Sequence, residues 1–349
     1  MTISVSLFYA LCVLVPFALV FWFSPWMVKF CRRQGLVANP KEARHIHNVP
    51  TPHGGGLLVV LVAVPLGLFA VHFAQLPFAP WLDLLLLLSL LVAGIGWLDD
   101  KHSLSPRVRL LVHLFAVAMT VLLMPPLFDV LPLWLDKIIT MLAWAWFISL
   151  FNFMNGADGL AESEAVFIAA AVALLVPQLS PLALVIAGAS LGFLRVNWHP
   201  AKLFLGDVGS TWLGYVLGGL LLLPAANDGW RLTAPLATLT LVFCADATWT
   251  LVRRIVQGHN PLIPHKRFWF HRALDLGLSH DQLVMRVMKL NGILFALAVL
   301  SLMFGLPWLS LPLGLGLMAL VGLKIRRAEA MLRVEKTAAR PKPKQRKKR

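Results

Sequence analysis

Residues 82–98 read LDLLLLLSLLVAGIGWL, and the next three residues are Asp99, Asp100 and Lys101. The stretch is apolar apart from one aspartate and one serine, and it is close to the roughly 20 residues that an α-helix needs to cross a bilayer. The apolar stretch is followed directly by these three charged residues. This pattern predicts a membrane-spanning helix whose last turn brings charged groups to the membrane surface.

The whole chain shares this apolar character. Of its 349 residues, 59% are hydrophobic and only 13% are charged, and the mean hydropathy is +0.77. Soluble domains carry about 25% charged residues. A chain this apolar cannot cover itself with polar surface in water, so the composition excludes an ordinary soluble globular protein.

Apolar runs recur along most of the sequence and predict an all-α fold, a polytopic transmembrane helical bundle of about 11 helices. The count could be ten, because the sixth, seventh and last two runs are short or closely joined. We expect residues 1–325 to form the transmembrane domain and residues 326–349 to form a basic cytoplasmic tail. The predicted spans are 5–28, 55–74, 82–98, 109–128, 134–152, 162–178, 181–197, 210–226, 232–252, 291–306 and 308–324.

The net charge of +15 is distributed unevenly between the spans. Lysines and arginines follow spans one, three, seven and nine and fill the tail, whereas only Lys137 and Arg231 fall on the opposite side. Loops rich in Lys and Arg stay in the cytoplasm. We therefore expect a periplasmic N-terminus and a cytoplasmic C-terminus, with anionic lipid at the basic tail. Nucleic-acid binding is the other interpretation of this charge, and its placement beside spans disfavours it.

Two acidic motifs on the predicted cytoplasmic side could hold a metal ion. Adjacent carboxylates such as Asp99 and Asp100 repel each other and are costly to desolvate, and a divalent ion or another cation relieves that cost. A solvated acidic loop is the alternative. Asp207 lies between glycines in LGDVGS at the start of a span, where a carboxylate can bind Mg²⁺ or cap the helix, and neither role excludes the other.

Amides and cations gather in the other loops on this side. The segment NFMNGADG, residues 152–159, interrupts two apolar runs, and such irregular backbone is tolerated at membrane depth only around a protein-lined or water-lined cavity. A later loop, residues 258–272, is rich in His, Lys and Arg, which suits pyrophosphate recognition but also fits an ordinary basic loop. Carboxylates, cations and glycine-rich turns on one face indicate phosphate chemistry.

Four motifs occur together and in a fixed order: PTPHGGG at 50–56, LDDKHSLSPRVRL at 98–110, NFMNGADGLA at 152–161 and KLFLGDVGS at 202–210. With the histidine-rich loop, they resemble the polyprenyl-phosphate N-acetylhexosamine-1-phosphate transferases. That family includes the enzymes that start O-antigen synthesis and the phospho-MurNAc-pentapeptide transferase of peptidoglycan. The resemblance covers residues 40–275, roughly the whole bundle.

The resemblance implies transfer of a sugar-1-phosphate from a UDP-N-acetylhexosamine to undecaprenyl phosphate, with release of UMP. It places the enzyme in the bacterial inner membrane with its active site on the cytoplasmic face, and a homodimer is one alternative for its assembly. The implied cofactor is Mg²⁺, with Mn²⁺ as a substitute, held by Asp207 and Asp100. The implied catalytic residues are Asp99, Asp100 and Asp207. The implied substrate-binding residues are Lys101, Asn152, Asn155, Asp158, Lys202, His265, Lys266, Arg267 and His271.

Two departures from the family pattern leave finer points open. The family commonly has Asp where this chain has Asn155, and the histidine loop reads PHKRFWFH instead of a compact H-x-H-H run. The loop is closer to the O-antigen initiating branch, so N-acetylglucosamine and the 6-deoxy sugars N-acetylfucosamine and N-acetylquinovosamine all remain candidates. A transporter using Asp246 and His113 is an alternative function, as is a catalytically inactive scaffold.

Overall fold

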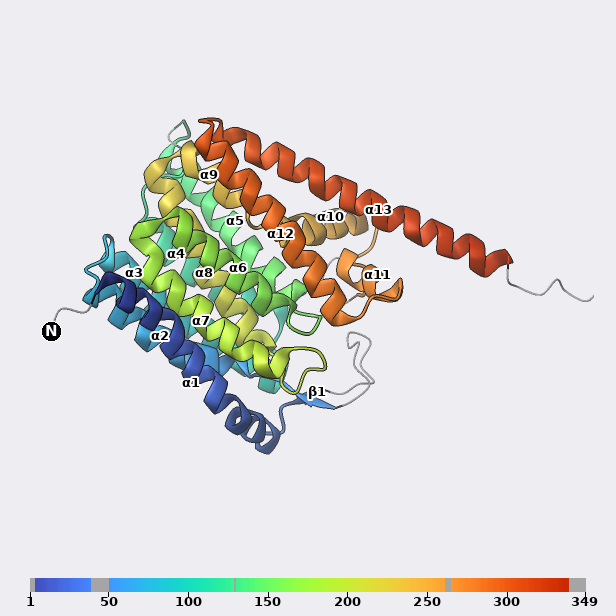
Figure 1. Cartoon of the computed structure of the whole chain (residues 1–349), viewed down its shortest axis with the longest axis horizontal. Coiled ribbons are helices and arrows are strands. Elements are labelled where there is room, and N and C mark those ends of the chain that lie inside the picture. The colour runs from blue at the N-terminus through green and yellow to red at the C-terminus, as the bar shows by residue number, and fades with distance from the viewer. Residues whose placement is uncertain (1–3, 39–49, 129, 261–264, 339–349) are drawn as a thin grey trace, which may run out of the picture.

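The protein is a bundle of helices with one short strand pair among the described residues (Figure 1). The computed structural model describes residues 4–38, 50–128, 130–260 and 265–338. This architecture agrees with the predicted all-α membrane protein. The elements are α1 (Val5–Arg33), β1 (Val37–Ala38), β2 (Thr51–Pro52), α2 (Gly56–Phe73), α3 (Ala79–His102), α4 (Pro106–Leu122), α5 (Leu133–Met154), α6 (Leu160–Leu175), η1 (Pro177–Leu179), α7 (Ser180–Asn197), α8 (Gly206–Asp228), α9 (Trp230–Thr238), α10 (Leu241–Val256), α11 (Trp269–Asp275), α12 (His280–Met303), η2 (Pro307–Leu309) and α13 (Ser310–Ala338).

Eight of the described helices are long and apolar enough to cross a membrane, and the number is nine if a bent pair counts as one span. The bent pair is α9 and α10, whose axes differ by 74°. The predicted spans 109–128 and 162–178 correspond to α4 and α6, which have only 17 and 16 residues. Eleven crossings and the orientation of the termini therefore stay predictions.

Helix α8 lies at the centre of the bundle. In the 18-residue apolar stretch of α8, 94% of the residues are buried. The corresponding value for α1 is 17%, so α1 presents most of its surface outward. Small residues let neighbouring backbones approach α8 closely, as is typical of membrane helices. A Cβ added to Gly56 at the start of α2 would lie only 2.3 Å from the Cα of Gly209.

Two aromatic side chains connect α8 to its neighbours in the interior. The Trp144 indole of α5 donates a hydrogen bond to the Tyr215 carbonyl at 3.0 Å, and the Trp212 indole donates to the Ser89 hydroxyl of α3 at 2.9 Å. Buried indole N–H groups need such acceptors. The first residues of α8, including Asp207, are therefore held by a rigid and deeply packed helix.

The last two helices differ most from the predicted spans. Helix α12 begins at His280, eleven residues before the predicted span at 291, because Ser279 and Gln282 form a capping box at its start. Helix α13 continues without a break past the predicted domain boundary at residue 325 and extends beyond the rest of the bundle (Figure 1). Residues 339–349 of the predicted tail, and Lys41 and Arg44 of the first basic loop, lie outside the described residues.

Candidate active site

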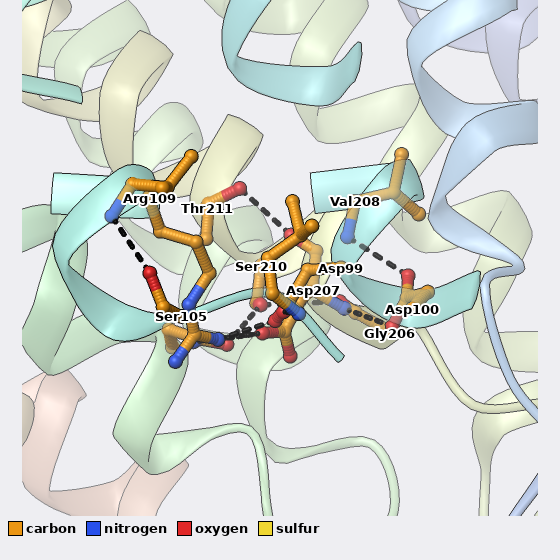
Figure 2. Close-up of polar contacts among 12 residues, drawn as sticks. Asp99, Asp100, Ser105, Arg109, Gly206, Asp207, Val208, Ser210 and Thr211 are labelled. Carbon is orange, nitrogen blue, oxygen red and sulfur yellow. Dashed lines mark hydrogen bonds and ion pairs between the residues drawn. The ribbon is translucent and has the colours of Figure 1, made fainter. Parts of the chain in front are cut away.

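Two carboxylates from different helices meet on one guanidinium. Asp99, in the last turns of α3, and Asp207, in the first turn of α8, both accept a hydrogen bond from Nη1 of Arg109, and the distance to Asp207 is 2.7 Å (Figure 2). The Asp99 side chain is only 9% exposed, and its second oxygen accepts the Leu104 N–H at 2.6 Å. The arrangement therefore places a cation between two acidic groups that are 108 residues apart in the sequence.

Asp100 has a different environment from its neighbour. Its two carboxylate oxygens accept the backbone N–H groups of Asp207 at 2.9 Å and Val208 at 3.1 Å (Figure 2). A negative charge at a helix N-terminus is stabilised by the exposed amides and by the helix dipole. Asp100 thus fixes the end of α3 to the start of α8 and sets the direction in which Asp207 points.

Glycine at position 206 is required for this junction. Its φ of +76° is in the left-handed region, and a Cβ there would come within 2.5 Å of the Asp100 carboxylate and 2.6 Å of the Gly54 amide. Side chains other than hydrogen are strained in this conformation. The glycine before Asp207 therefore permits the close contact between the first loop, α3 and α8.

The predicted amide residues reach the same site from the end of α5. The Asn152 side-chain amide lies 3.4 Å from the Asp207 carboxylate, and its oxygen accepts the Ser210 hydroxyl at 2.6 Å. Asn155 points its amide at the Gly206 carbonyl, also at 3.4 Å. The NFMNGADG segment thus lies directly against the first turn of α8.

Asp158 belongs to a neighbouring cluster with two histidines that the sequence did not single out as ligands. Its buried carboxylate accepts from Nδ1 of His199 at 2.7 Å and from the Ala201 N–H at 3.1 Å. The His199 ring stacks on that of His280, with centroids 4.9 Å apart. The three side chains offer atoms within 4.8 Å of one another, a spacing that could hold a metal ion. Nδ1 of His280 also accepts the Asp158 N–H at 3.0 Å, so this nitrogen already has a partner in the protein.

The histidine loop reaches the site through α11. A Cβ on Gly156 of the NFMNGADG segment would lie 2.9 Å from the Phe270 ring and 3.7 Å from Nε2 of His271. Burial lowers the pKa of His271 to about 3, and positive charge on His265 and Lys266 adds to the effect. Burial and the charges of Arg254 and Arg267 lower the pKa of His265 to about 4. Both imidazoles are therefore neutral hydrogen-bonding groups at pH 7.

The predicted lysines and the loop arginine lie on the surface of the protein. Lys101, Lys202, Lys266 and Arg267 are exposed. Within the described part of the chain, no carboxylate forms an ion pair with Lys101 or Lys202. Their role in binding a phosphate-bearing ligand stays a prediction.

The acidic site fits a magnesium ion better than the histidine cluster does. Asp99 and Asp207 supply hard oxygen ligands and already share a cation in Arg109, whereas two of the three groups in the cluster of Asp158 are imidazoles, which suit zinc and related metals. Asp100, predicted as the second ligand, uses both oxygens for α8 amides. Asp207 and Asp99 therefore already share one cation, and Asp100, the other predicted ligand, is bonded to the same turn of α8.

Comparisons with known proteins agree with this site. The sequence profile of glycosyl transferase family 4 matches residues 82–225, which include the acidic pair, the NFMNGADG segment and Asp207. The matched segment is less than half of the chain, and it shows similarity to this family where the acidic site lies. The match confirms the predicted kinship with polyprenyl-phosphate N-acetylhexosamine-1-phosphate transferases. The histidine loop lies beyond the matched residues.

Curated proteins of similar sequence align along most of the chain. A probable undecaprenyl-phosphate N-acetylglucosaminyl 1-phosphate transferase of Bacillus subtilis is 29% identical over 82% of this chain and 83% of its own length. A decaprenyl-phosphate N-acetylglucosaminephosphotransferase of Mycolicibacterium smegmatis is 29% identical, with 77% and 76% covered. A phospho-N-acetylmuramoyl-pentapeptide-transferase of Thermosynechococcus vestitus is 32% identical, with 63% and 64% covered.

Arg109 is the residue that the sequence interpretation undervalued. Its place after the acidic pair, with Ser105 and Arg107, predicts only a possible phosphate partner, yet it contacts both Asp99 and Asp207. A signal was present, because Ser105 caps α4 and Pro106 occupies its first turn, which places Arg109 one turn into the helix. For His199 and His280, we find no sequence signal that would have joined them to Asp158.

Proposed function

We propose that the protein transfers a sugar-1-phosphate from a UDP-sugar to a polyprenyl phosphate. The observation that carries the proposal is the meeting of Asp99 and Asp207 on Arg109, at the membrane-helix ends that the family motifs mark. In the predicted orientation the site would be reachable from both the bilayer and the cytoplasm, which suits one lipid substrate and one water-soluble substrate. The names of the relatives, which act on undecaprenyl or decaprenyl phosphate, support the same substrate class.

The reaction is a phosphoryl transfer with balanced bonds. An oxygen of the lipid phosphate attacks the β-phosphorus of the UDP-sugar, a new P–O bond forms, and the bond from that phosphorus to the bridging oxygen breaks. UMP leaves with the bridging oxygen, and the product is a polyprenyl-pyrophosphoryl sugar. Catalysis of such a transfer rests mainly on positioning and on neutralisation of charge.

Each group of the acidic site has a role in this proposal. Asp207 and Asp99 hold Mg²⁺, and Asp100 orients Asp207 through the α8 amides. Bound Mg²⁺ would neutralise charge on the pyrophosphate and polarise its oxygens. Arg109 balances the two carboxylates when no metal is present and binds a phosphate oxygen when the metal occupies them. Asp99 also orients the lipid phosphate. Removal of a proton from the lipid phosphate by Asp99 is a weaker alternative, because a phosphate monoester is already largely ionised at pH 7.

The donor nucleotide occupies the side of the site that faces α11. Asn152, Asn155 and Asp158 line its approach, and His265 and His271 contact it as neutral hydrogen-bonding groups. The attractive charge comes from the exposed cations Lys101, Lys202, Lys266 and Arg267. This division of labour follows from the lowered pKa of the two histidines, which leaves pyrophosphate binding to lysine and arginine.

The cellular setting is proposed from charge and kinship. The distribution of Lys and Arg supports an inner-membrane protein whose site faces the cytoplasm, with anionic lipid at the basic end of the chain. N-acetylglucosamine is one donor sugar to test, since two of the relatives are named for it. N-acetylfucosamine and N-acetylquinovosamine are the others, because the histidine loop resembles the O-antigen initiating branch.

The test is release of UMP by the purified protein. The assay contains undecaprenyl phosphate, Mg²⁺ and each UDP-N-acetylhexosamine in turn, with parallel samples lacking lipid or containing EDTA. UMP release that needs lipid and metal is the expected result, and the best donor identifies the sugar. Absence of release with every donor, from protein shown to be folded, would reject the transferase and favour a scaffold or a transporter.

A further inference from the structure

Helix α11 carries His271 and Phe270 against the NFMNGADG segment, but it has only seven residues. Isolated helices shorter than about 12 residues are marginal in water, and most helical stability in proteins comes from tertiary contacts. The N-cap residue of α11, Phe268, has no side chain that could cap the helix. The position of His271 must therefore be fixed by contacts with other elements.

The first contact comes from Asp246 in α10, the carboxylate that the sequence analysis placed in the alternative transporter function. Its side chain is buried, with 3% of the residue exposed. The two oxygens accept the N–H groups of Trp269 at 2.6 Å and Phe270 at 3.2 Å, and Thr250 donates to the same group at 3.3 Å. Asp246 therefore caps the N-terminus of α11 from a different helix.

The second contact comes from α13, the last helix described. Arg272 of α11 donates two hydrogen bonds to the Glu329 carboxylate, one from Nε and one from Nη2. Both side chains are largely covered, at 12% and 27% exposure. The Trp269 ring packs against Gly322, where an added Cβ would lie 2.7 Å from the ring. Bidentate arginine–carboxylate pairs are strong and directional.

These contacts hold α11 at its start and at its middle. Asp246 binds its first turn, and Glu329 binds the side chain that follows His271. Neither carboxylate lies among the groups that we assign to the substrates. Movement of α11 would carry His271 and Phe270 away from Gly156, and so away from Asn152 and Asn155.

We propose that Asp246 and Glu329 are positioning residues for the donor nucleotide, so that α13 belongs to the framework of the active site. The inference rests on the proposed transferase function, because it assigns α11 to the UDP-sugar side. It predicts that disturbing either carboxylate affects the UDP-sugar far more than the lipid or the metal. Transport through the bundle is then not needed to account for Asp246.

Charge reversal across the Arg272–Glu329 pair provides the main test. Glu329→Arg and Arg272→Glu should each raise the KM for the UDP-sugar about tenfold, with a much smaller change in kcat and in the KM for polyprenyl phosphate. The double variant, in which the two charges are exchanged, should recover most of the loss. Arg326→Glu, on the same helix and without a recorded ion pair among the described residues, is the matched control.

Asp246 is tested by conservative and non-conservative replacement. Asp246→Asn retains one acceptor oxygen for the Trp269 N–H and should keep part of the UDP-sugar affinity, whereas Asp246→Ala removes both acceptors and should lose it. Thermal unfolding of each purified variant shows whether the bundle is intact. If Asp246→Ala does not fold, Asp246→Asn and the charge-reversal variants test the positioning role instead.

A measurement without turnover separates this inference from the proposed function. Hydrogen exchange of residues 269–275 should be faster in Glu329→Arg than in the parent protein and should slow again in the double variant, while α8 is unchanged. An inactive parent protein would reject the transferase, yet exchange would still report on α11. Unchanged exchange and unchanged KM in the charge-reversal variants would overturn the inference.

Discussion

Arg109 occupies the place between Asp99 and Asp207 that a divalent ion would take, and its removal gives an unusual prediction. Hydrogen bonds between charged groups contribute about 1.5–3 kcal/mol each. The Arg109 and Asp207 side chains are both 27% exposed, so we take about 2 kcal/mol as the net value of the two bonds together. A metal ion that binds both carboxylates has to replace these bonds.

The Arg109→Ala variant should therefore bind Mg²⁺ more tightly and have a lower turnover rate. Since 1.4 kcal/mol corresponds to a factor of ten, loss of about 2 kcal/mol of competition lowers the half-saturating Mg²⁺ concentration by up to about 30-fold. Turnover at saturating Mg²⁺ should fall by at least about tenfold, because the phosphate loses a charged donor.

The assay combines Mg²⁺ titration of UMP release with Mg²⁺ titration of the melting temperature in detergent. The second readout reports binding even if the variant has no turnover, since a ligand that binds only the folded state raises its stability. Arg107→Ala is the control, because Arg107 is exposed and lies two residues earlier in the same helix. An unchanged or higher Mg²⁺ requirement in Arg109→Ala would refute the competition between arginine and metal.

Three further predictions concern the metal ligand, the packing and the pH dependence. Asp207→Asn should reduce UMP release by at least about 100-fold while the melting temperature in EDTA stays near that of the parent protein; activity retained at saturating Mg²⁺ would reject the metal assignment. Gly56→Ala should destabilise the bundle by about 1–3 kcal/mol or more, because the new methyl group meets the Gly209 backbone at 2.3 Å, whereas Gly94→Ala, with no atom within 4 Å, should be tolerated; equal expression and melting of the two variants would contradict the packing argument. Burial lowers the pKa of His271 from 6.5 to about 3, so the folded chain binds fewer protons than the unfolded chain between these values, and stability should be complete above pH 6.5 and decrease as the pH falls. At pH 5 the free energy of unfolding should be lower by about 2 kcal/mol, and hydrogen exchange in α11 should be faster. The same pH dependence in a His271→Gln variant would show that His271 is not its cause.

The apolar runs of the sequence predicted helix positions well because membrane insertion depends on local composition. The run at 55–74 corresponds to α2, Gly56–Phe73, and the run at 134–152 corresponds to α5, Leu133–Met154. Length and hydropathy are properties of a single segment, so no knowledge of neighbouring helices is needed to recognise them. The number of crossings is harder to predict, because α4 and α6 are short and the α9–α10 pair is bent.

The contacts of the site were harder to foresee because they join distant residues. Arg109 and Asp207 are 98 residues apart, and nothing in either local sequence specifies that pair. The sequence did indicate that Asp246 is unusual, since a buried charge inside a span needs a partner. The structure supplies that partner from the backbone of α11, more than 20 residues later in the chain.

The bond between Arg272 and Glu329 also bears on the order in which the enzyme is assembled. During synthesis α11 leaves the ribosome well before α13, so all the helices that surround Asp207 can pack while α11 still lacks its second attachment. Domains form progressively from the N-terminus as a chain is made. Under the proposed function, the donor side of the site would thus be completed last, after Glu329 has emerged.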